Sequence, residues 1–149
     1  MRQDVGMRGY VRPTIDTPAF RDADGAVIEY GRRWPGSPPE DAYSVDTHPE
    51  RFAPLHAVGD ALIAHLSETF EVDVEEGVEV ASDLNRPSSF AVLRAVRLQP
   101  ADPQCASVTF VFDAYPGLSV HSGLLHDAHY PHCGCDACDE EWRSVADEL

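Results

Sequence analysis

The sequence predicts an α+β fold in which an antiparallel sheet of about four to six strands packs against one long helix. A shorter C-terminal helix is expected to follow a loop rich in cysteine and histidine. Three observations lead to this prediction: one segment has apolar residues at helical spacing, several segments alternate apolar and polar residues, and turn-forming residues separate them. The 149 residues fit one domain, which we place at residues 19–149 after an extended N-terminal arm at residues 1–18.

The arm carries no sustained apolar period, which is typical of extended chain near a terminus. Phe20 and residues 27–30 then flank the turn-forming run at 22–25, and this pattern predicts a short β-hairpin. Residues 31–41 contain three prolines and two glycines, so we expect an irregular loop there.

The long helix is predicted to begin at Thr47. The run Thr47-His48-Pro49-Glu50 has the form of a capping box, and the proline has no N–H to lose in a first turn. Apolar residues then recur at helical spacing over about five turns. They are Phe52, Leu55, Val58 or Gly59, Leu62, Ile63, Leu66 and Phe70. We expect this stripe to face the core.

Strands are predicted after the helix. Within the acid-rich segment 68–83, Val72 and Val74 alternate with polar residues, as do Val78 and Val80, so one or two short edge strands are expected. Three stronger alternating segments follow at residues 90–98, 108–113 and 118–124. Turns separate these three segments, so an antiparallel meander with the helix on one face is the simplest architecture.

The last helix is predicted at residues 137–149. Trp142, Val145, Ala146 and Leu149 share one face of it, and Asp136 is a suitable N-cap. Cys138 would then lie in the first helical turn, with Cys133 and Cys135 in the loop just before it.

Residues 126–138 contain three of the seven histidines and three of the four cysteines. The three cysteines form a C-x-C-x-x-C run at a loop-to-helix junction, where their thiolates can converge on one ion as in zinc-binding knuckles. The predicted ligands of a possible structural zinc site are therefore Cys133, Cys135 and Cys138, with His126 or His129 as the fourth. A closed site of this kind adds folding free energy rather than catalytic power.

Other fourth ligands and other interpretations remain open at this stage. His121 and His132 are further candidates, although a direct neighbour of Cys133 is disfavoured, and Cys105 would complete a four-thiolate site if its loop folded over the cluster. The cysteines could instead be reduced packing residues. A redox pair at Cys135 and Cys138 has the C-x-x-C spacing, but the expected βαβ context is absent and nearby acids disfavour a thiolate.

The formal charge is −15, and all eleven basic residues are arginines. Six arginines against five acids leave the first 33 residues at +1 and the remainder at −16. Such a field repels nucleic acid and suits a basic protein partner or simple solvation. No apolar run approaches the roughly 18 residues of a membrane span, and no secretory signal is recognisable. Together with clustered cysteines, this predicts a cytoplasmic protein.

Motifs for common enzyme chemistry are missing from the sequence. It contains no glycine-rich phosphate loop, no nucleophile elbow and no H-E-x-x-H run, and the lack of lysine excludes Schiff-base chemistry. We therefore predict a small acidic, non-enzymatic protein with a structural zinc site and a protein-interaction role. The alternative is a metal- or thiol-dependent enzyme whose active site is the His121 to Cys138 region. Nothing in the sequence predicts an oligomeric state.

Several short motifs also resemble a known family. They are residues 37–44, residues 48–55, Phe110-Val111-Phe112 with Pro116-Gly117, and residues 121–127 leading into the run Cys-Gly-Cys-Asp-Ala-Cys-Asp-Glu at 133–140. From about Tyr10 onward the chain resembles a family of small acidic actinobacterial proteins, a domain of unknown function. The resemblance implies a shared fold and no particular chemistry.

Overall fold

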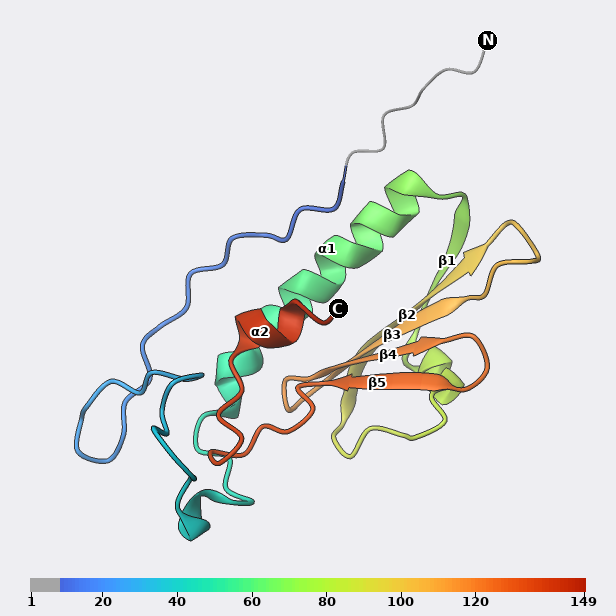
Figure 1. Cartoon of the computed structure of the whole chain (residues 1–149). Coiled ribbons are helices and arrows are strands. Elements are labelled where there is room, and N and C mark those ends of the chain that lie inside the picture. Colours follow the sequence, from blue (N-terminus) through green and yellow to red (C-terminus); the bar gives the residue numbers. More distant parts are fainter. Residues whose placement is uncertain (1–8) are drawn as a thin grey trace.

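A five-stranded antiparallel sheet carries one long helix on one face in the computed structural model, which describes residues 9–149 (Figure 1). The strands are β1 (Val72–Glu76), β2 (Val92–Pro100), β3 (Val108–Asp113), β4 (Leu118–Ser122) and β5 (His126–Tyr130), and they lie in chain order. The helices are α1 (Pro54–Thr69) and α2 (Trp142–Ala146), and the 3-10 helices are Glu40–Ala42, Pro49–Phe52 and Val78–Asp83. The predicted α+β meander is confirmed.

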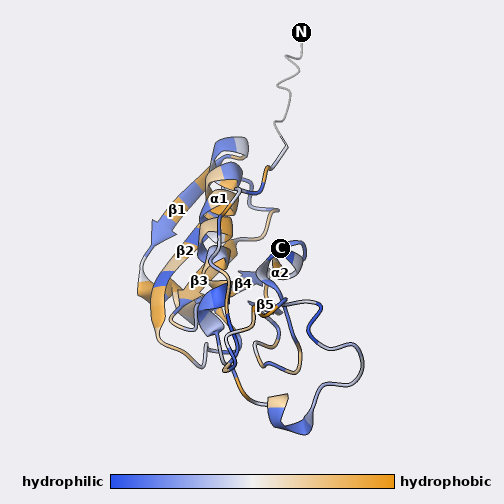
Figure 2. Ribbon diagram, turned by 90° about the vertical axis from the view of Figure 1, so that its left-hand side faces the viewer, coloured by the Kyte–Doolittle hydropathy of each residue, from blue (hydrophilic) through white to orange (hydrophobic). Residues whose placement is uncertain are grey.

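The main core lies between α1, α2 and one face of the sheet (Figure 2). Its most deeply buried side chains are Phe52, Leu55, Val58, Val96, Leu98, Phe110, Phe112, Leu118 and Val145. Each large apolar side chain that is fully buried contributes on the order of 1.5–3 kcal/mol. Gly59 allows α1 to approach the sheet closely, because a Cβ atom there would lie 2.9 Å from Cε1 of Phe112.

The 3-10 helix Val78–Asp83 packs on the opposite face of the sheet. The alternation of Val78 and Val80 predicted a strand, and that prediction is wrong for this segment. Val80 instead packs into a small second cluster with Val111, while Asp83 accepts hydrogen bonds from Arg97 at 2.6 and 2.7 Å. These two anchors hold the segment across the sheet.

The predicted capping box at Thr47 does not form. A 3-10 turn begins at Pro49, and the α-helix begins only at Pro54, so each proline occupies a first position where its missing N–H costs nothing. Thr47 instead donates its backbone N–H and its hydroxyl to the carboxylate of Asp136. The two prolines therefore divide the predicted helix into a 3-10 turn and an α-helix. Thr47 binds the distant Asp136 carboxylate instead of capping the helix.

The C-terminal region also differs from its prediction. Residues 126–130 form the edge strand β5, although their polar sequence gives no apolar alternation. The last helix covers only Trp142–Ala146, so Asp136 is not its N-cap and Cys138 lies in a turn before it. Asp139 has a φ of 54°, which is incompatible with a continuous helix through this point.

The N-terminal segment runs along the outside of the domain (Figure 1). Residues 9–18 have no regular secondary structure, and Arg12 pairs with Asp147 beyond α2 at 2.6 Å. The rest of the predicted arm, residues 1–8, lies outside the described residues. The predicted hairpin is reduced to one bridge between Arg21 and Val27. Among the helices of residues 9–149, none combines the length and apolar character needed to cross a bilayer.

Candidate metal centre

Three thiols meet in the segment that follows β5. The Sγ atoms of Cys133, Cys135 and Cys138 all lie within 4.8 Å of one another, and the first two are 3.3 Å apart. Cys135 is buried, Cys133 is half-buried and Cys138 is exposed, and none forms a disulfide. Within residues 9–149, no other three potential metal-ligating side chains bring their ligand atoms this close together. The predicted convergence of the cysteines is therefore present.

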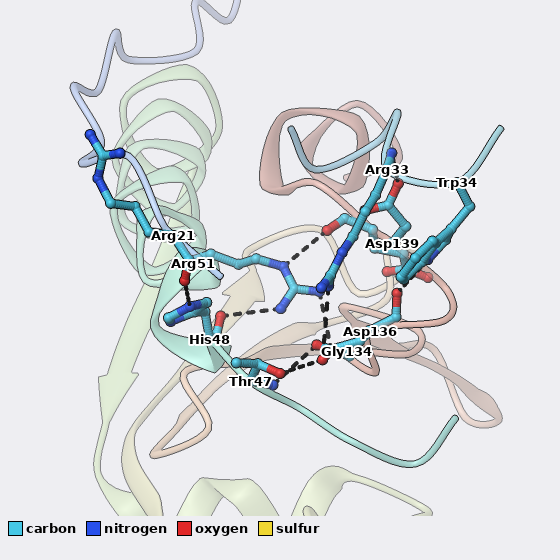
Figure 3. A network of polar contacts seen from close by, with 10 residues as sticks. Arg21, Arg33, Trp34, Thr47, His48, Arg51, Gly134, Asp136 and Asp139 are labelled. Atoms are coloured by element: carbon cyan, nitrogen blue, oxygen red, sulfur yellow. Dashed lines mark hydrogen bonds and ion pairs between the residues drawn. The ribbon is translucent and has the colours of Figure 1, made fainter. Parts of the chain in front are cut away.

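Backbone hydrogen bonds to a distant part of the chain shape this segment. The N–H of Asp136 donates to the carbonyl of Val45 at 2.7 Å, and the N–H of Ala137 donates to the carbonyl of Ala42 at 3.0 Å. Asp136 is only 6% exposed, and its carboxylate accepts a hydrogen bond from the backbone N–H of Thr47 at 3.1 Å (Figure 3). The hydrogen bonds from the loop before α1 therefore hold the cysteine turn in its conformation.

Arg51 is the second support of the turn. The residue is only 3% exposed, and its guanidinium donates to three backbone carbonyls, those of His48, Gly134 and Glu140, at 3.1 to 3.2 Å (Figure 3). It also lies 4.1 Å from the centroid of the Tyr30 ring. In the described part of the chain, no carboxylate lies within ion-pair distance of this guanidinium. A buried positive charge thus faces the cysteine segment with only neutral acceptors.

Arg33 and Trp34 close the other side of the turn. The backbone N–H of Arg33 donates to Oδ2 of Asp139 at 2.8 Å, and its guanidinium lies 3.8 Å from the Asp136 carboxylate. The indole N–H of Trp34 donates to the carbonyl of Asp136 at 2.9 Å. Two of the acids around the thiols, Asp136 and Asp139, are therefore engaged by donors from residues 33–51, which offsets part of the negative charge that the sequence places there.

The thiols differ in acidity because their surroundings differ. Burial raises the pKa of Cys135, but N–H groups of Cys138 and Ser44 and the neighbouring thiols donate hydrogen bonds to its sulfur and bring its pKa below the ordinary value. Hydrogen bonding with the Cys133 and Cys135 thiols, followed by burial, raises the pKa of Cys138 to about 12. N–H donors aimed at sulfur favour the thiolate, which is the form that binds metals.

The two predicted histidine ligands do not join this group. His126 opens β5 and pairs with Ser122, so roughly 13 Å of strand separates its Cα from that of Tyr130, after which the cysteine segment begins. His129 is nearer, but its Nδ1 lies 2.7 Å from Oγ of Ser119. The structure brings together the three predicted cysteines and places both imidazoles elsewhere.

The remaining candidate ligands are also accounted for. Cys105 lies in the turn between β2 and β3, at the opposite end of the sheet from the cysteine segment, so its loop does not fold over the cluster (Figure 1). His132 pairs with Glu148 at 2.5 Å, and His121 pairs with Asp127 at 2.5 Å.

Two residues at the site were not identified from the sequence. Arg51 gave no signal, because a single arginine in the first turns of a predicted helix is ordinary. Glu140 follows the cysteine run, and its Oε1 accepts the N–H of Cys133 at 3.3 Å. Its Oε2 is buried and accepts no hydrogen bond from residues 9–149. The only advance signal for Glu140 was its position two residues after Cys138.

A polar pocket of about 370 Å³ adjoins the cysteine segment at Gly134. Its lining includes Ser119 and His129, which are hydrogen-bonded to each other, and Tyr115, whose hydroxyl donates to Asp46 at 2.8 Å. Burial, and then the neighbouring Asp46 carboxylate, raise the pKa of Tyr115 well above its usual value. Polar side chains line much of the pocket, but none of the three cysteines is among its lining residues.

The chain was also compared with known proteins. A family model described as a family of unknown function (DUF6226) matches residues 16–149. No curated protein and no solved structure matches the chain.

Proposed function

The chain belongs to this family of unknown function, and we propose that it is a non-enzymatic interaction protein whose cysteine cluster holds a structural zinc ion. The observation that carries the proposal is the convergence of three Sγ atoms within 4.8 Å. Three free cysteines in one short segment also suit a reducing compartment, so the proposal places the protein in the cytoplasm.

The donor set supports zinc. Zinc binds thiolates in tetrahedral sites, and soft sulfur ligands disfavour magnesium and calcium. The backbone N–H groups of Cys138 and Ser44 that donate to the sulfur of Cys135 resemble the outer-shell hydrogen bonds that orient metal ligands. The structure therefore offers both the ligands and part of their support.

The position of the cluster supports a structural role. The cysteine turn lies between β5 and α2, and residues 42–51 bind it from the side through Asp136 and Arg51. A zinc ion bound here would link these segments, and its binding free energy would add to the stability of the fold. The site thus lies where the chain has little regular secondary structure to hold it.

Charge and the open sheet edge support an interaction role. On either side of β1, Glu71 and Gly77 form backbone hydrogen bonds with the β2 side of the sheet. Because these bonds alternate along an antiparallel strand, the N–H and C=O groups of Val72, Val74 and Glu76 point to the open edge. Glu75 and Glu76 pair with arginines of β2. Glu68, Glu71, Asp73 and Glu79 form no ion pair with the described residues. An extended basic peptide would fit this edge as an added strand.

Metal content tests the zinc proposal. The full chain, purified without chelator, is expected to contain about one zinc per molecule, with thiols that react with a thiol reagent only after chelation. Cys135→Ser should lose the metal, whereas Cys105→Ser, which alters the distant turn, should retain it. Metal-free protein with freely reacting thiols would overturn the proposal.

A synthetic peptide that alternates lysine and valine tests the partner proposal. Binding should weaken with salt and should be lost in Asp73→Lys, while Asp24→Lys in the N-terminal hairpin should bind as the parent does. Val74→Pro removes only an N–H that points away from β2, so it should reduce binding without disrupting the sheet. Equal binding by all four proteins would contradict an edge-binding partner.

The pocket beside Gly134 favours a second candidate function. In it, Ser119 holds one nitrogen of His129 and the other nitrogen has no hydrogen-bond partner among the described residues. A metal- or thiol-dependent enzyme with the His121 to Cys138 region as its active site would require an open position on the metal. Cobalt-substituted protein whose absorption changes with added cyanide would support the metal-dependent form of this candidate, and an unchanged spectrum would remove that form.

A further inference from the structure

A groove of about 360 Å³ lies on the α1 side of the sheet, over strands β3 to β5. Its floor is a row of cross-strand neighbours, because Phe110 pairs with Val120, and Val120 pairs with Ala128. Residues two positions further along a strand stand on the same face, and there Ser122 pairs with His126. The groove therefore has an apolar floor that ends at a hydroxyl and an imidazole.

The groove is open because the helical layer does not cover this part of the sheet. Leu62 and Leu66 of α1 form one wall, but α2 has only five residues, whereas the sequence predicted a helix through residue 149. Ala128 adds only a methyl group to the floor. The apolar lining is accordingly half-buried at Leu62, Leu66, Val108, Val120, Ala128, Tyr130 and Leu149.

The two ends of the groove differ in charge. At the Tyr130 end, the Tyr130 hydroxyl donates to the carbonyl of Glu148 at 3.4 Å, and the Glu148 carboxylate lies 2.5 Å from Nε2 of His132. At the other end, His126 pairs with no carboxylate in residues 9–149. The only acid in the lining is thus already paired, and the Ser122 and His126 end offers O–H and N–H donors.

We propose that this groove binds a medium-chain alkyl carboxylate, with its chain along the apolar floor and its carboxylate at Ser122 and His126. The volume falls within the range of roughly 300–1,000 Å³ that is typical of small-molecule pockets, which are mostly apolar with a few polar groups. From His126 to Tyr130 the floor follows roughly 13 Å of strand, which suits an extended chain such as that of decanoate. None of the cysteines lines the groove, so this proposal does not depend on a bound metal.

Calorimetric titration of the full chain with decanoate, below the concentration at which it forms micelles, tests the proposal. The parent should show one saturable site. Ala128→Leu fills the floor and should weaken binding at least about tenfold, while its resistance to urea should not fall because the added atoms occupy open apolar space. Ala101→Leu, in the exposed turn after β2, is the matched control and should bind as the parent does.

A second set of measurements tests where the carboxylate lies. Ser122→Ala and His126→Leu should each weaken decanoate binding by about threefold or more, because each removes one hydrogen-bond donor. Ser37→Ala, in the exposed N-terminal loop, should have no effect. Decyltrimethylammonium has a chain of the same length with a cationic head, and the parent should bind it at least about tenfold more weakly than decanoate.

Three results would overturn the proposal. The first is a parent that gives no saturable binding of decanoate, and the second is Ala128→Leu that binds decanoate as tightly as the parent. The third is a parent that sediments as a dimer and becomes monomeric in Ala128→Leu, since the groove would then be an interface between two copies of the chain. Equal affinity for the two amphiphiles would overturn the assignment of a carboxylate.

Discussion

Nη2 of Arg51 donates a hydrogen bond of 3.1 Å to the carbonyl oxygen of Gly134, the residue between the first two cysteines. This contact joins the 3-10 turn that precedes α1 to the cysteine turn that precedes α2. Because the guanidinium is buried, the joint is shielded from water and its loss leaves carbonyl groups without donors. Arg51 is therefore a central contact of the site even though it would not itself bind a metal.

Arg51→Leu is expected to destabilise the protein by about 3 kcal/mol, because three partly buried carbonyl groups lose the donor that a buried guanidinium supplies. Urea denaturation of the metal-free chain measures this effect apart from any metal. Arg32→Leu removes an exposed arginine and should change the unfolding free energy by no more than about 0.5 kcal/mol. Equal midpoints for the two variants would show that Arg51 does not support the turn.

Asp136→Ala should cost roughly 2 kcal/mol, since the backbone N–H and hydroxyl of Thr47 both lose a charged acceptor. The loop before α1 should also become more mobile, which amide hydrogen exchange at residues 42–47 can detect. Asp24→Ala in the exposed N-terminal hairpin is the control. Unchanged exchange in Asp136→Ala would mean that the backbone bonds alone hold the two segments.

Gly59→Ala should destabilise the protein by about 1–3 kcal/mol, although alanine is the better helix former by about 1 kcal/mol. The new Cβ would lie 2.9 Å from Phe112 and 3.1 Å from Leu118, which is too close for a packed core. Adding Phe112→Leu should recover part of the loss, and a double-mutant cycle measures that coupling. Additive effects would show that the helix shifts instead.

The stability contributed by Asp83 should depend on pH. A hydrogen bond from Arg97, opposed by burial and aided by Thr109, lowers the pKa of Asp83 in the folded state. A lowered carboxyl pKa gives stability that is present above the unfolded pKa of about 3.9 and is lost as the pH falls through the folded value. Denaturation at about pH 7 and about pH 3 should therefore differ less for Asp83→Asn than for the parent.

At neutral pH, Asp83→Asn should cost roughly 1–2 kcal/mol, after allowing for solvent around a partly exposed pair. Asp73→Asn is a suitable control, because Asp73 lies on the open edge strand and pairs with no arginine in the described chain. A parent and Asp83→Asn with identical pH profiles would rule out this contribution.

Local pattern was sufficient for most of the fold. The apolar stripe from Phe52 onward corresponds to α1, and alternation identified β2, β3 and β4, because period and side-chain direction are coupled within each element. β5 was missed because an edge strand of histidine, aspartate and alanine shows no apolar alternation. The end of α1 was predicted better than its start, where Pro54 moved the helix boundary.

The site was predicted in part. C-x-C-x-x-C spacing identified the three thiols, because residues so close in sequence converge in almost any turn. The fourth ligand could not be ranked from sequence, since it depends on which way β5 carries His126 and His129. In the structure, His126 lies at the start of β5 and His129 is hydrogen-bonded to Ser119, and the converging group among the described residues contains only the three cysteines.

The sequence by itself determined the α+β class, the order of the main elements and the three sulfur donors, because each follows from spacing over a few residues. Only the tertiary structure decided what surrounds those donors. Trp34 binds Asp136 across 102 residues, and Arg51 reaches Glu140 across 89. No local pattern encodes contacts over such separations, since they depend on how α1 and the sheet bring distant loops together.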